Sequence, residues 1–154
     1  MRKNFVMLLA VLAASLLAGC AHVQMESADA DAVAKKFSAP ADGKAGIYVY
    51  RAGNYGGSLK KALYIDDNCL GVSAPNMFLY EQVTGNTEHK ISTQSEFSPN
   101  DLVLTTQAGK NYFIHQYIKM GVFVGGANLE LVEEDKGKEI IEKLNLAKKG
   151  ICNQ

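Results

Sequence analysis

The sequence contains no tryptophan, only three prolines and three cysteines, and no excess of charge of either sign. Without Arg2 and Lys3, which lie in the apolar leader, 14 basic residues stand against 16 acidic ones. This balance argues against a nucleic-acid partner, because binding the phosphate backbone requires a clustered basic face. A spanning N-terminal helix is not indicated either, because the apolar run at residues 5–17 is shorter than the about 20 residues that cross a bilayer.

The first 20 residues instead have the pattern of an export signal, with basic Arg2 and Lys3 before the apolar run and small residues after it. The segment Leu17–Cys20, Leu-Ala-Gly-Cys, resembles the bacterial lipobox. In proteins with that motif a peptidase cuts before the cysteine, here between Gly19 and Cys20, and the thiol carries a diacylglyceryl group. The resemblance therefore implies that residues 1–19 are removed and that Cys20 is lipidated. The alternative is an ordinary signal peptide with an incidental cysteine.

The predicted lipid determines the predicted location. Each buried methylene contributes about 0.8 kcal/mol, so two or three acyl chains hold a protein at the membrane where one chain binds only marginally. Ala21, rather than an aspartate, follows the cysteine. This resembles the pattern of lipoproteins that Gram-negative bacteria export to the outer membrane. We expect a cell-envelope protein that is lipid-anchored at the outer membrane and faces the periplasm.

Residues 20–40 are predicted to form the lipidated N-terminus and a flexible tether. Residues 21–36 are rich in Ala, Asp and other small or polar types and show no two-residue alternation. A short helix over Ala28–Lys36 is the alternative, because Ala favours helix. Residues 41–154 are predicted to form one domain, since the 135 residues that remain without the leader can bury a core.

Short alternating apolar runs from Gly46 onward predict a β-rich domain. We expect seven strands, over residues 46–51, 62–66, 77–83, 88–94, 102–106, 111–118 and 128–132. Turn-forming residues separate these runs and no helical pattern lies between them, which favours an antiparallel β-sandwich over a parallel sheet. After the strands, Ile140, Ile141, Leu144 and Ala147 recur at helical spacing before Gly150, which predicts one C-terminal α-helix.

Several short motifs follow one another along the strands. They are Tyr48–Arg51 before a Gly-rich loop, Tyr64–Asp67 followed by Leu70-Gly71, and the strand entry Gly109–Phe113. Their order resembles a family of uncharacterised bacterial lipoproteins, the domain of unknown function 2846, over roughly residues 45–132. The resemblance implies a lipid-anchored small β-sandwich of the envelope and provides no catalytic residues.

No motif in the chain indicates catalysis or metal binding. Gly71–Pro75 begins like the G-x-S-x-G nucleophile elbow but ends in proline. His22, His89 and His115 lack the spacing of metal ligands, and we expect the strand histidines to be half-exposed. Asp66–Asn68 offers oxygen donors without the EF-hand pattern, and a hairpin turn accounts for it. We therefore predict a protein that is not an enzyme and holds no metal and no cofactor.

The cysteine count predicts one disulfide. With Cys20 lipidated, Cys69 and Cys152 remain as an even pair in an oxidising compartment. A bond between them would close a loop of about 80 residues and stabilise the fold by roughly 4 kcal/mol. The alternative is two free thiols.

Two stretches are candidates for a binding surface. The loop Arg51–Lys61 combines Arg51, Lys60 and Lys61 with Tyr55 on a Gly-rich frame, which suits an anionic group or a glycan, although such a loop is also an ordinary solvated connection. The stretch Met120–Ala127 is apolar and Gly-rich, and forms either a hairpin buried in the core or an exposed patch that meets another envelope protein.

Together these features predict a non-catalytic binding or scaffolding module of the cell envelope. Its partners would be the membrane, through the acyl chains, and another envelope protein or a wall component, with Arg51–Lys61 at the edge of the contact surface. One alternative is a hydrolase of wall or lipid, which requires acidic or Ser-His residues in a cleft. Another is a periplasmic carrier of a small ligand or ion.

Overall fold

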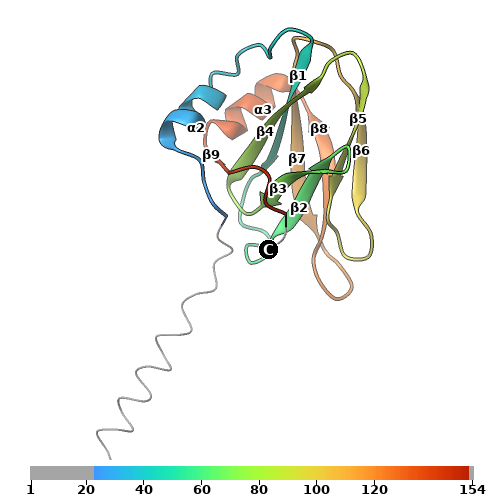
Figure 1. Cartoon of the computed structure of the whole chain (residues 1–154). Coiled ribbons are helices and arrows are strands. Elements are labelled where there is room, and N and C mark those ends of the chain that lie inside the picture. Colours follow the sequence, from blue (N-terminus) through green and yellow to red (C-terminus); the bar gives the residue numbers. More distant parts are fainter. Residues whose placement is uncertain (1–22, 153–154) are drawn as a thin grey trace, which may run out of the picture.

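The computed structural model describes residues 23–152, which form a two-layer β-sandwich with two short helices (Figure 1). The predicted signal peptide, the Gly19–Cys20 cleavage point and the lipidation residue Cys20 lie outside the described residues. The elements in chain order are α2 (Ala28–Ala34), β1 (Lys44–Arg51), β2 (Lys61–Ile65), β3 (Asn68–Ser73), β4 (Met77–Thr84), β5 (Glu88–Thr93), β6 (Asn100–Thr105), β7 (Asn111–Lys119), β8 (Gly126–Val132), α3 (Glu134–Ile141) and β9 (Asn145–Leu146).

The first sheet has the strand order β8-β7-β1-β4-β9, and the second has the order β3-β2-β5-β6. All neighbours are antiparallel except two pairs, β1 with β7 and β4 with β9. The predicted fold class, a mainly β sandwich with a helix near the C-terminus, is confirmed. The prediction is corrected in two respects, since the described chain has nine strands rather than seven and its first sheet is mixed.

The two strands that the sequence did not predict depend on partners. β3 follows β2 through the turn Asp66-Asp67, where both residues have positive φ, 49° and 62°, which short Asp side chains tolerate. β9 is two residues long and lies along the edge of β4, where the Ala147 N–H donates to the Phe78 carbonyl at 2.9 Å. Neither strand has enough alternation of its own to be recognised, so pairing determines both.

The C-terminal helix is shorter than predicted. Helical spacing indicated a helix up to Gly150, but α3 ends at Ile141 and the chain turns into β9. Leu144 still packs with Ile141, whereas Ala147 packs into the core between the sheets. The apolar stripe therefore identified buried residues correctly. The chain after α3 is extended because it pairs with the edge of β4.

Alternation along β1 divides the core into two parts. Ile47 and Val49 face the second sheet and belong to the main apolar cluster between the layers. Tyr48 and Tyr50 face the opposite side, where they pack with Ala34 of α2 and with Ile141 of α3. Figure 1 shows both helices on this outer side of the first sheet, so they cover an aromatic layer rather than the space between the sheets.

The segment before β1 is part of the domain. Val23 is only 4% exposed, the Glu26 N–H donates to the Leu146 carbonyl at 2.9 Å, and the Lys148 N–H donates to the Gln24 carbonyl at 2.8 Å. The Tyr48 hydroxyl donates to the Ala34 carbonyl at 3.0 Å, which fixes α2 to the sheet. The prediction of a flexible tether is therefore wrong from Val23 onward, and the alternative of a short helix corresponds to α2. Within residues 23–152, no helix has the length and apolar character needed to cross a membrane.

Candidate binding surface

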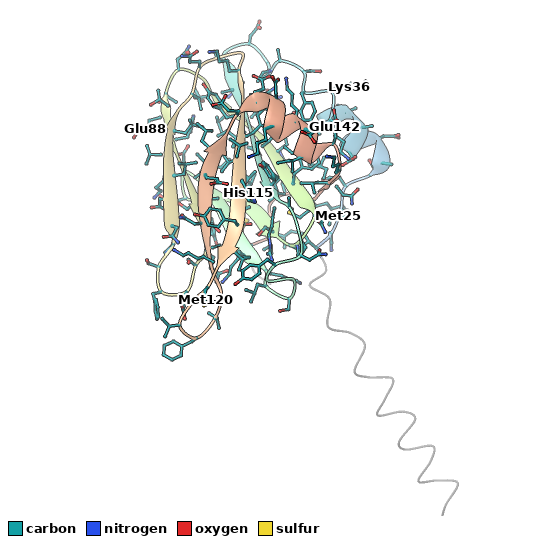
Figure 2. All side chains as sticks on the ribbon, turned by 180° about the vertical axis from the view of Figure 1, so that it is seen from behind. Met25, Lys36, Glu88, His115, Met120 and Glu142 are labelled. Atoms are coloured by element: carbon teal, nitrogen blue, oxygen red, sulfur yellow. A yellow bond between two sulfur atoms is a disulfide. The ribbon has the colours of Figure 1, made fainter. Side chains whose placement is uncertain are left out.

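Three loops meet at one end of the sandwich, and together we call them the loop end. They are residues 52–60 between β1 and β2, 94–99 between β5 and β6, and 120–125 between β7 and β8. Contacts between the two sheets bring them together: the Asn100 amide donates to the Ala127 carbonyl at 2.6 Å, and Ser95 Oγ accepts the Ala127 N–H at 3.1 Å. Figure 2 shows Met120 at this tip, with Lys36 and Glu88 toward the opposite end.

The loop end carries most of the exposed large apolar side chains of the described chain. Six of the ten such side chains lie on these three loops and are between 53% and 85% exposed. They are Tyr55, Phe97, Met120, Val122, Phe123 and Val124. Single exposed apolar residues are ordinary on a protein surface, but a contiguous group at one end indicates an interaction site.

Glu96 holds the 120–125 loop in one conformation. Its carboxylate accepts the backbone N–H groups of Val122 at 2.7 Å and Val124 at 3.1 Å, and that of Phe123 as well. These bonds, above all the one from Phe123, keep the pKa of Glu96 below its ordinary value of 4.5. The 120–125 loop is therefore preorganised. The Glu96 carboxylate that holds it faces the loop backbone rather than a ligand.

Arg51 is buried beneath the 52–60 loop, holds it through hydrogen bonds, and is not available to a ligand. It is 2% exposed and donates to the carbonyls of Leu59 at 2.6 Å, Gly56 at 2.6 Å and Tyr55 at 3.2 Å. Its position follows from the alternation of β1, which turns Ile47, Val49 and Arg51 toward the second sheet. The prediction that Arg51 binds an anion is therefore wrong, because the side chain is buried and directs three hydrogen bonds to backbone carbonyls.

The other residues predicted for this loop divide between surface and interior. Tyr55 is 65% exposed and borders a hollow of about 340 Å³ together with Phe123 and Val124. Lys60 is half-buried, and Lys61 is buried. Burial lowers the pKa of Lys61, and the charge of Arg51 lowers it further, whereas Glu96 raises it. The predicted polar surface is therefore reduced to Tyr55 and Lys60.

Of the two alternatives for the apolar stretch Met120–Ala127, the structure shows the exposed patch. Residues 120–124 protrude into solvent, while Ala127 is fully buried at the start of β8. Glu96 and Phe97 complete the patch, and the Phe97 and Phe123 rings contact edge to face at 6.4 Å between centroids. Sequence reasoning missed both residues. An isolated Phe in the polar turn 94–99 was the only local sign of the patch. The residues that Glu96 binds are 26 to 28 positions away in the sequence, so no short pattern connects them.

The two histidines within residues 23–152 each contact an acidic side chain. His89 is buried, not half-exposed as predicted: its Nδ1 lies 2.6 Å from Asp66 Oδ2, and its Nε2 lies 2.8 Å from the Thr84 carbonyl. Burial opposes a charge on His89, but the Thr84 and Asp66 contacts outweigh it and raise the pKa of His89. His115 contacts Glu130 at 2.9 Å and stacks on Tyr50, whose pKa is raised to about 12 by burial and then by Glu130.

The other candidate chemistry is not brought together in the part of the chain that the structure describes. Ser73, the serine of the elbow-like sequence, is buried in β3, and its hydroxyl makes no hydrogen bond. No group of three or more His, Cys, Asp and Glu side chains in residues 23–152 is placed to hold a metal ion. Cys69 and Cys152 form the disulfide that the cysteine count predicted, with their Cα atoms 5.9 Å apart.

Comparison with known proteins relates the chain to a family of unknown function. The family described as "Protein of unknown function (DUF2846)" matches residues 41–127. The chain belongs to this family. An uncharacterized protein of Haemophilus influenzae is 54% identical over 134 residues, which are 87% of this chain and 79% of that relative. No solved structure matches the chain.

The family prediction from the sequence motifs is thus confirmed. The range that matches the DUF2846 family, residues 41–127, begins just before β1 and ends in the first residues of β8. It contains all three loops of the loop end and leaves out α2 and α3. The candidate surface is therefore built within the family region, whereas the helices that cover the aromatic layer lie outside it.

Proposed function

We propose that this protein is a lipid-anchored, non-catalytic binding module of the bacterial cell envelope and that the loop end is its contact surface. The observation that carries the proposal is the group of six exposed apolar side chains held on three ordered loops. A rigid apolar surface binds well because little conformational entropy is lost when it is covered. Because Glu96 and Arg51 hold the loops in one conformation, we interpret the loop end as a recognition surface rather than as a set of simple connections.

The lipid anchor is supported by the segment Leu17–Cys20 and by the basic and apolar residues before it. Ala21 supports the outer membrane as the site of anchoring. A protein held at a membrane meets its neighbours at a high effective concentration, so weak recognition is sufficient. The absence of a catalytic function is part of the proposal, and the buried Ser73 and the paired His89 support it.

Cross-linking in the native envelope tests the contact surface. A photoreactive residue at position 123 should give one defined cross-linked product, either with a protein or with lipid, whereas the same residue at position 103 should not. Val103 is the matched control, because it is also exposed and apolar but lies in the middle of β6, away from the loop end. Identical products from both positions, or none from position 123, would show that the loop end is not a contact surface.

A second candidate function, carriage of a small apolar ligand, is favoured by one hollow. It has a volume of about 440 Å³, lies between α2 and the first sheet, and is lined by apolar atoms of Val33, Tyr48, Tyr80 and Leu146. Small-molecule sites are concave and mostly apolar, with few polar groups. Native mass spectrometry of the protein purified from membranes should show a bound small molecule if this function holds, and Tyr80→Ala should remove it.

A further inference from the structure

We infer that the loop end inserts into a phospholipid bilayer, with Met120, Val122, Phe123 and Phe97 entering the same membrane that holds the acyl chains on Cys20. The inference rests on the proposed lipid anchor and names the partner of the proposed contact surface. Four features of the chain carry it: the distance between the anchor and the domain, the position of the first described residues, the charge of the loop end, and the hydrogen bonding of its backbone.

The anchor holds the domain close to the membrane. Val23 is buried in the main core cluster and follows Cys20 by three residues. Because each residue spans at most about 3.6 Å, Cys20 lies no more than about 11 Å from Val23. A flexible tether of 16 residues would have reached about 20 to 25 Å. The ordered segment from Val23 removes this spacer, so one face of the domain must lie against the lipid headgroups.

The first described residues lie in the half of the molecule that carries the loop end. Met25 forms a bridge with Ala147, and the adjacent Leu146 pairs with Phe78 near the start of β4. At the start of β4, Met77 pairs with Arg51, where the 52–60 loop begins. In Figure 2, Met120 lies at one end of the domain, Lys36 and Glu88 lie toward the other, and Met25 lies near mid-height between them. The anchor and the apolar loops can therefore reach one membrane together.

The charge of the loop end favours an anionic surface. The loop end and its flanking residues, 51–61, 94–99 and 119–125, contain four basic side chains and one acidic side chain, Glu96. Arg51 and Lys61 are buried, so Lys60 and Lys119 are the basic side chains nearest the surface. The Glu96 carboxylate accepts hydrogen bonds from three backbone N–H groups of the 120–125 loop, and Lys60 and Lys119 outnumber its single negative charge. Lys119 lies at the base of the 120–125 loop and is exposed. Basic residues beside exposed apolar ones are typical of segments that lie in the interface of anionic bilayers.

The backbone of the 120–125 loop is prepared for an apolar surrounding. An N–H group that enters the apolar part of a bilayer without a partner costs several kcal/mol. In this loop the N–H groups of Val122, Phe123 and Val124 already donate to Glu96. The Met120 and Phe123 side chains also project from a hairpin tip rather than forming a flat face. Such a convex tip suits a fluid lipid layer better than a flat protein surface.

The absence of tryptophan allows a direct test. Phe123→Trp places a sole tryptophan at the tip, and Val103→Trp places one at the exposed control position in β6. Each full-length protein is purified from membranes and reconstituted into vesicles of phosphatidylethanolamine and phosphatidylglycerol, with or without brominated acyl chains. We expect the emission of Phe123→Trp to shift to shorter wavelength and to fall at least twofold with brominated lipid, while Val103→Trp stays unchanged.

The failure of this inference differs from the failure of the proposed function. Mass spectrometry of the same samples reports whether Cys20 carries acyl chains. An unmodified Cys20 would overturn the anchor and with it the inference. An acylated Cys20 with unquenched Phe123→Trp would overturn only the membrane insertion. A cross-link from position 123 to a protein would also overturn only the membrane insertion, and the loop end would then be a protein-binding surface.

Discussion

The ion pair between Asp66 and His89 couples the stability of the fold to pH. The raised pKa of His89 means that its contribution is complete below about 6.5 and is lost as the pH rises through the folded-state value. For Asp66, burial opposes the shift, but the hydrogen bonds from His89 and the Lys90 N–H lower its pKa below 3.8. Its contribution is therefore present above 3.8 and is lost as the pH falls through the folded-state value.

We expect the free energy of unfolding to be highest near pH 5 and to fall by about 1 kcal/mol between pH 6 and pH 9, a modest change because Asp66 is nearly half-exposed. Denaturant titration at each pH measures this. His89→Gln should remove most of the dependence. A wild-type stability that is constant over this range would contradict the assignment of a charged His89.

Arg51 is predicted to be structural rather than ligand-binding. Arg51→Met should lower the free energy of unfolding by about 3 kcal/mol, because three backbone carbonyls lose their donor. Arg51→Lys should restore only part of it, since an ammonium group cannot reproduce the planar fork. Lys110→Met is the control, because Lys110 is exposed and its replacement should change stability by less than about 0.5 kcal/mol. Equal effects of both Met variants would contradict this role.

Glu96 is predicted to hold the 120–125 loop without contributing much to global stability. Glu96→Ala removes the acceptor of the Val122, Phe123 and Val124 N–H groups, so hydrogen exchange in this loop should accelerate. Exchange measured by mass spectrometry should remain unchanged in β1 and β4. Glu133→Ala, at an exposed acidic position outside the loop end, should leave the loop protected. Unaltered exchange in the Glu96 variant would show that the loop is ordered by other contacts.

Among the larger elements, the C-terminal tail depends most on distant contacts. It runs from α3 into β9, and the Gly150 N–H donates to the Leu70 carbonyl at 3.0 Å before the chain reaches the disulfide. Cys152 is joined to Cys69 at the start of β3, 83 residues earlier. The tail thus connects the edge of the first sheet to the edge of the second, and closes one side of the sandwich.

Removal of this disulfide should loosen the tail and destabilise the whole domain. The loop-entropy estimate for about 80 residues is roughly 4 kcal/mol, and a measured loss of about 2 to 4 kcal/mol is expected for the double variant Cys69→Ser, Cys152→Ser. Denaturant unfolding of the oxidised protein and the variant compares them. The wild type treated with a reductant should behave like the variant. A loss below 1 kcal/mol would show that the hydrogen bonds of β9 hold the tail without the covalent link.

For the molecule as a whole, the ordered N-terminal segment changes how the domain relates to its proposed anchor. Residues 23–40 were expected to keep the domain away from the membrane, but their backbone pairs with β9 and α2 packs on the aromatic layer. The domain from Val23 onward and the loop end thus form one folded unit, and the proposed anchor at Cys20 is only three residues away from it along the chain. Binding therefore depends on orientation at the membrane rather than on the reach of a tether.

The strands of the sandwich were largely predictable from the sequence, because a half-buried strand shows its buried side in a two-residue period. The runs at β1, β2, β4, β5, β6, β7 and β8 were all anticipated close to their observed bounds. β9 was not, because a two-residue strand has no period and its conformation is stabilised by the edge of β4. The apolar spacing at residues 140–147 led to a helix prediction that was too long, because burial of Leu144 and Ala147 does not require a helix.

The candidate surface could be predicted only in part. The sequence alone determined that residues 120–127 are apolar and Gly-rich, that Tyr55 lies in a turn, and that a lipobox-like segment precedes the domain, because these are properties of short contiguous stretches. The tertiary structure decided that Arg51 is buried, that Glu96 holds the 120–125 loop, and that the three loops share one end. Such outcomes depend on which strand ends meet when two sheets pack, and no local pattern encodes that meeting.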